Sequence, residues 1–185
     1  MNFYSIDIIN NIVDNSNEDE IIDKLDNFEK EILGMFVKYS YRSISPKYVF
    51  NLLKDKSNKV VFHCMDNTFD IYNCPTSMIY NRYNDKENNE IHYYILMICT
   101  KHTFKNKGYA SALLNGFIEK IKQEKNKING NKTIKIILSS TVESVTFYEY
   151  YGFIWTRNNL TEYPILMKYE KYENDKEYFI MELIV

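Results

Sequence analysis

Apolar residues recur at helical spacing in three stretches of the 185-residue chain. The first stretch covers 18–38, the second covers 46–53, and the third begins near Gly108. Ser45 as N-cap and Pro46 at the first helical position mark the start of the second stretch. In the third stretch, one continuous apolar stripe holds Ala110, Leu113, Leu114, Phe117, Ile118 and Ile121. The spacing predicts three amphipathic helices, each with one face on a core.

Strand-like runs lie between these helical stretches. Short apolar or alternating runs occur at 3–9, 59–66, 76–83, 133–140 and 177–185. Residues 91–100 are nearly all apolar or aromatic, which is typical of a central strand covered on both faces. A strand at 91–100, a helix and a strand at 133–140 follow one another, and this order predicts parallel pairing of the two strands. We therefore expect an α/β (α+β) fold with a mixed central sheet flanked by helices.

The composition predicts a single domain that spans residues 1–185. Apolar residues make up 45% of the chain and aromatic residues 16%, which is enough for one sizeable core. The net charge of −2 hides an uneven distribution, because 1–36 hold nine acidic residues and 101–135 hold nine lysines. These lysines follow the solvent side of one helix without interleaved aromatic residues, so we expect no nucleic-acid partner.

Cysteines and histidines give no sign of a metal site. Cys64, Cys74 and Cys99 are odd in number and lack CxxC spacing, which predicts buried apolar residues and neither a disulfide framework nor metal ligands. The three histidines form no ligand cluster with them. The start of the chain lacks a basic region followed by an apolar run, and no stretch approaches the length of a membrane span. We expect a cytoplasmic protein without a membrane partner, with a nuclear location as the alternative.

The connection between the strand at 91–100 and the third helix has the character of an anion site. A helix entrance hinged at a glycine presents unpaired amides and the positive end of the helix dipole. Gly108 permits close backbone approach, Ala110 keeps the next turn small, and nearby lysines attract anions. This pattern predicts phosphate binding, although glycine and lysine also occur at strand-to-helix turns that bind nothing.

Two motifs, taken together, resemble those of the GCN5-related N-acetyltransferase (GNAT) family. The family's pyrophosphate motif has Gln or Arg, two variable residues, Gly, one variable residue and then Gly or Ala. Here it is Lys105-Asn106-Lys107-Gly108-Tyr109-Ala110. A second motif, a short helix ending in Phe-Tyr-x-x-x-Gly-Phe, is complete at 147–153, within a helix expected over 141–151 and before a strand starting at Phe153. Lys105 departs from the family pattern, but such a loop acts mainly through main-chain donors.

The resemblance implies a sheet split at the strand 91–100, with acetyl-CoA in the gap. It places the acceptor-side strand and helices in 1–55, acetyl-CoA binding and catalysis in 90–153, and C-terminal strands in 154–185. Main-chain groups at the strand end would bind the pantetheine arm, and amides of the next loop would hold the pyrophosphate. The implied cofactor-binding residues are Ile98, Cys99, Thr100, Lys105, Asn106, Lys107, Gly108, Tyr109, Ala110 and Ser111. Acetyl-CoA is the implied co-substrate, and no metal is expected.

The implied reaction is direct attack of a neutral primary amine on the acetyl thioester. It needs a base for the amine, donors for the oxyanion and an acid for the thiolate. Tyr148 stands at the family position of the general acid. The positions where family members carry a glutamate base hold Ile95 and Ile136, which accept no proton. The remaining candidates are Glu90, His92, Tyr94 and His102. We take His92 as catalytic because histidine titrates near neutral pH, with core packing as its structural alternative.

The acceptor is defined only by class. Acidic residues between Asp14 and Glu31 would lie on the acceptor side, which favours a cationic amine such as a polyamine, a lysine or a peptide N-terminus. These acids can instead lie on the solvated face of the first helix. Because the usual base is missing, a catalytically silent acetyl-CoA-binding regulatory domain is the second candidate function. The sequence leaves monomer and homodimer open.

Overall fold

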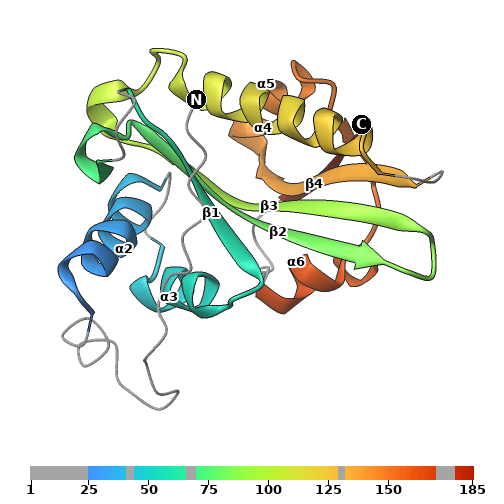
Figure 1. The fold of residues 1–185 in the computed structure, drawn as a ribbon, viewed down its shortest axis with the longest axis horizontal. Helices are drawn as coiled ribbons and strands as arrows, with labels where there is room; N and C mark the ends of the chain where they lie inside the picture. The colour runs from blue at the N-terminus through green and yellow to red at the C-terminus, as the bar shows by residue number, and fades with distance from the viewer. Residues whose placement is uncertain (1–24, 41–43, 66–69, 129–131, 170–177) are drawn as a thin grey trace. The chain divides into compact units, whose positions relative to one another are not determined.

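The computed structural model describes residues 25–40, 44–65, 70–128, 132–169 and 178–185 (Figure 1). The strand predicted at 3–9 and the acidic residues from Asp14 to Asp23 lie outside these ranges. The helices are α2 (Asn27–Tyr39), α3 (Pro46–Lys54), α4 (Tyr109–Lys125), α5 (Val145–Glu149) and α6 (Pro164–Tyr169). The strands are β1 (Asn58–His63), β2 (Thr76–Asp85), β3 (Glu90–Thr100), β4 (Thr133–Thr141), β5 (Ile154–Trp155) and β6 (Tyr178–Ile184).

Six strands form one mixed sheet in the order β1-β2-β3-β4-β6-β5. β3 and β4 pair in parallel, with Glu90 opposite Thr133 and Ile95 opposite Leu138. β6 pairs antiparallel with both β4 and β5. The predicted parallel pairing and the predicted α/β class with a mixed sheet are therefore confirmed. The split of the sheet stays a prediction.

By its contacts, the chain divides into two compact units. The first, which we call the loop unit, comprises the described residues up to Ile79 together with Met97–Leu113. The second, the network unit, comprises the described residues within Tyr80–Leu96 and Leu114–Val185. β2, β3 and α4 contribute residues to both units, and each unit is described by itself below.

In the loop unit, α2 begins later than its apolar pattern suggested. The Asp26 carboxylate accepts a hydrogen bond from the Glu29 amide (2.8 Å), and the Glu29 carboxylate accepts one from the Asp26 amide (3.0 Å). This reciprocal capping box fixes the helix start at Asn27. The prediction of one helix over 18–38 is therefore wrong at Leu25 and Asp26, which are not helical.

In the loop unit, α2 and α3 each bury four apolar side chains in the core. Their buried side chains are Ile32, Leu33, Met35 and Phe36 of α2 and Val49, Phe50, Leu52 and Leu53 of α3. As predicted, α3 begins at Pro46 after Ser45. The Asn58 side-chain amide donates to the Leu52 carbonyl at 2.8 Å, and this buried bond ties β1 to α3.

In the network unit, α4 and α6 lie on opposite faces of the strands (Figure 1). Side chains alternate between these faces along β3. Tyr93 turns toward α4, where its ring centroid lies 6.1 Å from that of Phe117. The predicted apolar stripe of α4 is buried at Leu114, Phe117, Ile118 and Ile121. None of the described helices is both long and apolar enough to cross a membrane.

The segment predicted as one helix over 141–151 has two parts. A 3₁₀ turn covers Val142–Ser144, and α5 follows it. Gly152 then adopts a φ of 86°, and the Phe153 amide donates to the Tyr148 carbonyl at 3.2 Å. This is the turn that ends a helix at a glycine. The next strand begins at Ile154, one residue later than predicted.

Candidate functional site

The end of β3, in the loop unit, is held by threonine hydroxyls. Thr76 Oγ1 donates to the Cys99 carbonyl at 2.7 Å, and Thr100 Oγ1 donates to Thr76 Oγ1 at 3.0 Å. Ile98 and Thr100 are half-buried, whereas Cys99 is buried with its thiol 3.2 Å from Ser77 Oγ. Among the three residues predicted to bind pantetheine, Cys99 can therefore offer only its main chain, whose carbonyl already accepts one hydrogen bond.

The loop that follows contains two residues with left-handed backbone angles. Asn106 has a φ of 60° and Gly108 a φ of 80°. Glycine adopts such angles readily, and asparagine tolerates them better than most residues. A Cβ at Gly108 would meet no atom within 4 Å. The glycine is thus required by the backbone conformation and not by crowding. Turns of this kind can point successive amides at an anion.

Amides at the start of α4 have no acceptor within the helix. The first helical hydrogen bond runs from the Ala112 amide to the Gly108 carbonyl at 2.9 Å, so residues 109–111 precede the helical ladder. The Lys105 amide, in contrast, donates to the His102 carbonyl at 3.3 Å. The predicted pyrophosphate donors therefore narrow to the residues after Lys105, where the helix dipole also favours an anion.

Lys101 anchors the start of the loop. Its amide donates to the Pro75 carbonyl at 2.9 Å, and its ammonium donates to the carbonyls of Ile71 (2.8 Å) and Tyr72 (3.0 Å). Burial lowers the pKa of this ammonium, although nearby negative groups act in the opposite direction. Lys101 therefore serves mainly to hold the chain before the loop.

Tyr109 anchors the other end of the loop. Its ring lies 5.7 Å from that of His63, and its hydroxyl lies 3.7 Å from Met65 Sδ. Phe104 packs edge-on against the same ring at 5.5 Å. The first turn of α4 is therefore held in place against the end of β1.

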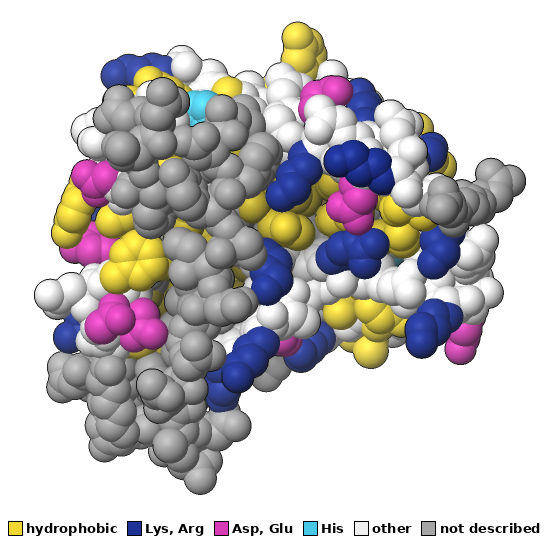
Figure 2. Space-filling model, in the orientation of Figure 1, with side chains coloured by type: hydrophobic (Ala, Val, Ile, Leu, Met, Phe, Trp, Pro, Cys, Tyr) yellow, Lys and Arg dark blue, Asp and Glu magenta, His cyan; other side chains and the backbone are white. Residues whose placement is uncertain are grey.

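Positive side chains around the loop reach into solvent. Lys105 and Lys107 are exposed, and Lys107 Nζ lies 5.6 Å from the Phe104 ring centroid. Figure 2 shows Lys and Arg side chains scattered over the visible face among apolar and acidic ones. Such dispersed charge attracts an anion from a distance and leaves its positioning to the main chain.

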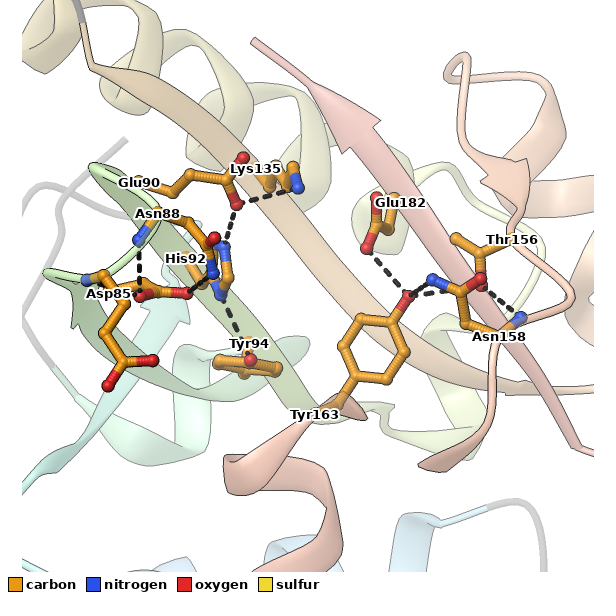
Figure 3. Close-up of polar contacts among 11 residues, drawn as sticks. Asp85, Asn88, Glu90, His92, Tyr94, Lys135, Thr156, Asn158, Tyr163 and Glu182 are labelled. Carbon is orange, nitrogen blue, oxygen red and sulfur yellow. Dashed lines mark hydrogen bonds and ion pairs between the residues drawn. The ribbon is translucent and has the colours of Figure 1, made fainter. Parts of the chain in front are cut away.

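A chain of hydrogen bonds runs along β3 in the network unit (Figure 3). His92 Nε2 lies 2.6 Å from Glu90 Oε2, and His92 Nδ1 lies 3.2 Å from the Tyr94 hydroxyl. Lys135 Nζ forms an ion pair with the same Glu90 oxygen at 2.7 Å. Because a carboxylate only accepts, His92 donates from Nε2, and Nδ1 of a neutral ring accepts a hydrogen bond from the Tyr94 hydroxyl. The chain therefore runs from Tyr94 through His92 to Glu90.

Burial and charge set the protonation states at the two ends of this chain. Burial alone would raise the pKa of Glu90, but hydrogen bonds and charge from Lys135 and His92 outweigh it and lower that pKa. Burial raises the pKa of Tyr94 well above its ordinary value. At neutral pH the chain therefore joins a carboxylate to a protonated tyrosine through the imidazole.

Asp85 brings a third potential metal ligand close to Glu90 and His92. The candidate ligand atoms of these three residues lie within 4.8 Å of one another. The Asp85 carboxylate accepts hydrogen bonds from the Asn88 amide (3.1 Å) and side chain (2.8 Å). All three groups thus have protein partners, so the cluster is satisfied without an ion.

A second polar cluster surrounds Tyr163 (Figure 3), and sequence reasoning missed it. The Tyr163 hydroxyl donates to Glu182 Oε1 at 2.8 Å, accepts from Asn158 Nδ2 at 3.0 Å and lies 3.2 Å from Thr156 Oγ1. Burial raises the pKa of Tyr163 to about 12. Glu182 lies opposite Ile137 in the β4–β6 pairing. A single acid within the apolar run at 178–185 was the signal that could have found it.

Tyr148, the predicted general acid, lies in α5 of the network unit. Its ring is buried between Phe147 and Phe153, with centroid distances of 5.1 and 5.7 Å. Burial raises its pKa to about 12, so the hydroxyl stays protonated at neutral pH. That is the state in which a general acid must begin.

The two positions where family members carry a glutamate base hold Ile95 and Ile136, and both side chains are buried. His102 is the one candidate for the base outside β3. His102 belongs to the loop unit, where its exposed ring lies 5.3 Å from that of Tyr39. Of the candidates, only the β3 residues of the hydrogen-bonded chain are joined to one another in the described parts of the structure.

A family model described as "Acetyltransferase (GNAT) domain" matches residues 76–167, which include the loop, β4 and α5. The chain carries an acetyltransferase domain of the GNAT family. Both the pyrophosphate-type loop and Tyr148 lie within the matched part of this GNAT domain. No match was found among the curated proteins.

Solved structures share the fold of this GNAT domain at low sequence identity. The NatC complex bound to Gag peptide and CoA matches with a TM-score of 0.56 and 18% identity, covering 84% of this chain and 89% of that one. GCN5 of Tetrahymena matches with a TM-score of 0.55 and 14% identity, and the match covers 84% of each chain. A third match is Naa50 of Arabidopsis thaliana in complex with the bisubstrate analogue CoA-Ac-MVNAL. Its TM-score is 0.52 at 13% identity, and the match covers 86% of this chain and 94% of that one. At these identities the likeness shows the fold.

Proposed function

We propose that this GNAT domain transfers an acetyl group from acetyl-CoA to a primary amine. The observation that carries the proposal is the loop after β3, where Asn106 and Gly108 at positive φ lead into helix amides without helical partners. Such an entrance suits a phosphorylated ligand held by the main chain. Two structural neighbours, the NatC complex and Naa50, are bound to CoA and to a CoA conjugate respectively, which supports acetyl-CoA as the co-substrate.

In this proposal, amides of residues 109–111 and the dipole of α4 hold the pyrophosphate. Lys105 and Lys107 attract it from a distance. The main chain from Ile98 to Thr100 binds the pantetheine arm. A lysine can replace the family's Gln or Arg at position 105, because the main chain positions the pyrophosphate and the Lys105 side chain only attracts it.

The hydrogen-bonded chain along β3 serves as the route for the amine proton. Tyr94 takes the proton while passing its own to His92 Nδ1, and the Glu90 carboxylate stabilises the imidazolium that forms. His92 is thus the group that stores the proton, as the sequence suggested. The contacts at 3.2 Å and 2.6 Å to Tyr94 and Glu90 support this role.

Tyr148 supplies the proton for the departing CoA thiolate. Its raised pKa keeps the phenol protonated until the thiolate, a stronger base than water, develops beside it. Attack forms the amide bond and breaks the thioester bond. The amine proton leaves through Tyr94, and the Tyr148 proton ends on the CoA sulfur.

The acceptor we propose is the N-terminal amine of a peptide or protein. The NatC complex is bound to a peptide and Naa50 to a bisubstrate analogue that contains one, and this supports a peptide acceptor over a polyamine. The acidic residues expected to favour a cationic amine lend little support where they are described. Asp26 and Glu29 use their carboxylates to cap α2.

The test is a thiol-release assay with acetyl-CoA and matched acceptors. The panel contains peptides with a free N-terminus, the same peptides N-formylated with a free lysine, and spermidine. We expect turnover with free N-termini and acetylation at that nitrogen by mass spectrometry. Binding of acetyl-CoA without turnover on any acceptor, together with no effect of Tyr148→Phe, would instead favour a silent regulatory domain. Absence of binding to CoA in calorimetry would refute both functions.

A further inference from the structure

Two of the three cysteines meet in the loop unit, although their spacing along the chain predicts no disulfide framework. Cys64 follows β1, and Cys74 follows the 3₁₀ turn at Ile71–Asn73. Their sulfur atoms lie 2.7 Å apart, and both thiols are free. A disulfide bond needs the two sulfurs about 0.7 Å closer. Both cysteines are buried, as the sequence predicted, but their spacing along the chain did not reveal that the two sulfurs meet.

The backbone already brings the two residues opposite each other. The Met65 amide donates to the Asn73 carbonyl at 3.1 Å, one position beyond Cys64 on one segment and one before Cys74 on the other. Residues facing each other across two antiparallel segments have closely spaced Cβ atoms. A bond between the sulfurs thus requires only a small adjustment of the side chains.

We propose that Cys64 and Cys74 form a redox-active pair that closes to an intramolecular disulfide beside the cofactor loop. Residues next to the two cysteines contact the two ends of the loop. Met65 contacts Tyr109 at the start of α4, and the carbonyl of Tyr72 accepts from Lys101 at the start of the loop. The disulfide therefore crosslinks the two segments that support the loop at its two ends.

The oxidant we specify is a low-molecular-weight disulfide such as oxidised glutathione. Cys64 is 7% exposed and Cys74 0%, so the Cys64 thiolate attacks first, forms a mixed disulfide and releases one glutathione thiol. Cys74 then attacks Cys64 Sγ, forms the internal disulfide and releases the second glutathione. Two protein thiols lose two electrons and two protons in total, and oxidised glutathione becomes two molecules of reduced glutathione.

Cys99 provides an internal control, because its sulfur has no cysteine beside it. Its nearest polar neighbours are Ser77 Oγ at 3.2 Å and the Met35 carbonyl at 3.8 Å. Burial raises the pKa of the Cys99 thiol to about 12 and that of the Cys74 thiol further, so the thiol pKa does not separate these two cysteines. The difference between them is the sulfur of Cys64, which lies 2.7 Å from that of Cys74. Cys99 therefore stays reduced when the pair oxidises.

The experiment treats the full chain with oxidised glutathione under native conditions, blocks remaining thiols with iodoacetamide and maps the peptides by mass spectrometry. We expect a crosslinked Cys64–Cys74 peptide, an alkylated Cys99, and a melting temperature raised by about 5 °C, because the crosslink closes a loop in the unfolded chain. Cys99→Ala should oxidise like the parent chain, whereas Cys64→Ala and Cys74→Ala should show no such rise. Glutathione adducts without the crosslink, or three alkylated thiols in the folded chain, would overturn the proposal. Neither result depends on acetyl transfer.

Discussion

The loop after β3 lies in the loop unit and the hydrogen-bonded chain along β3 lies in the network unit, and the two regions work by different means. In the loop, the groups poised for chemistry are amides of residues 109–111, while Lys105 and Lys107 point into solvent. In the chain, the working groups are the side chains of Glu90, His92 and Tyr94, joined at 2.6 and 3.2 Å. One region uses the backbone, and the other uses side chains.

This difference predicts which substitutions impair the function of each region. A main-chain site depends on φ and ψ, so it tolerates most side chains except at positions that need a left-handed angle. A side-chain relay depends on each donor and acceptor, and losing one hydroxyl interrupts it. The comparison therefore predicts a steep effect at one glycine, intermediate effects at tyrosines, and a small effect at a loop lysine.

The largest effect is expected for Gly108→Val. Its φ of 80° is unfavourable for a β-branched residue, at a cost on the order of 2 kcal/mol, or about 30-fold in CoA affinity if the loop must keep this angle to bind. Calorimetry with CoA measures the change. Gly34→Ala is the matched control, because Gly34 lies in α2 with no atom within 4 Å of a new Cβ. Equal CoA affinity for both variants would refute the main-chain site.

The next effect is expected for Tyr148→Phe, which keeps the buried ring and removes the acid. We expect kcat to fall about tenfold, equivalent to about 1.4 kcal/mol in the barrier, with little change in the affinity for acetyl-CoA. The thiol-release assay at saturating acetyl-CoA and acceptor measures kcat. Tyr150→Phe, two residues away at a side chain that is 84% exposed, should leave kcat unchanged. If both variants turn over at the parent rate, Tyr148 is not the acid.

The sequence predicted the start of α4 and its buried stripe well because their signals are local. Gly108 and the apolar stripe of α4 lie within one stretch of chain, and each acts through backbone conformation or helical period. The start of α2 was placed wrongly because the apolar helical spacing continues before Asn27. The capping box of Asp26 and Glu29 nevertheless starts the helix at Asn27.

The side-chain clusters could be predicted only in part. His92 was singled out, and Glu90 and Tyr94 were separate candidates. The three meet because alternate residues of a strand share a face. The Tyr163–Glu182 bond joins residues 19 positions apart, and Lys135 reaches Glu90 through the pairing of β3 with β4. Such contacts depend on strand register, which composition and spacing within one segment do not reveal.

A smaller effect is expected for Tyr94→Phe, which removes the hydroxyl that donates to His92. We expect kcat to fall about fivefold with the KM for acetyl-CoA unchanged, because water replaces the missing link imperfectly. Tyr93→Phe is the matched control on the opposite face of β3, where the Tyr93 hydroxyl accepts from Arg82 Nε at 3.0 Å. A fall in kcat of the same size for Tyr93→Phe would show that the loss is structural and would remove the relay.

The smallest effect is expected for Lys105→Ala, and it tests the comparison most sharply. Lys105 stands where the family has Gln or Arg, its side chain is exposed, and its amide is already bonded to the His102 carbonyl at 3.3 Å. If its side chain only attracts the anion, CoA affinity should fall less than about threefold, and the loss should fade as salt screens the charge. Lys122→Ala, at an exposed α4 lysine paired with Glu119, controls for general charge. A loss that exceeds tenfold and persists in high salt would mean that Lys105 binds the pyrophosphate directly, and that the loop works by side chains after all.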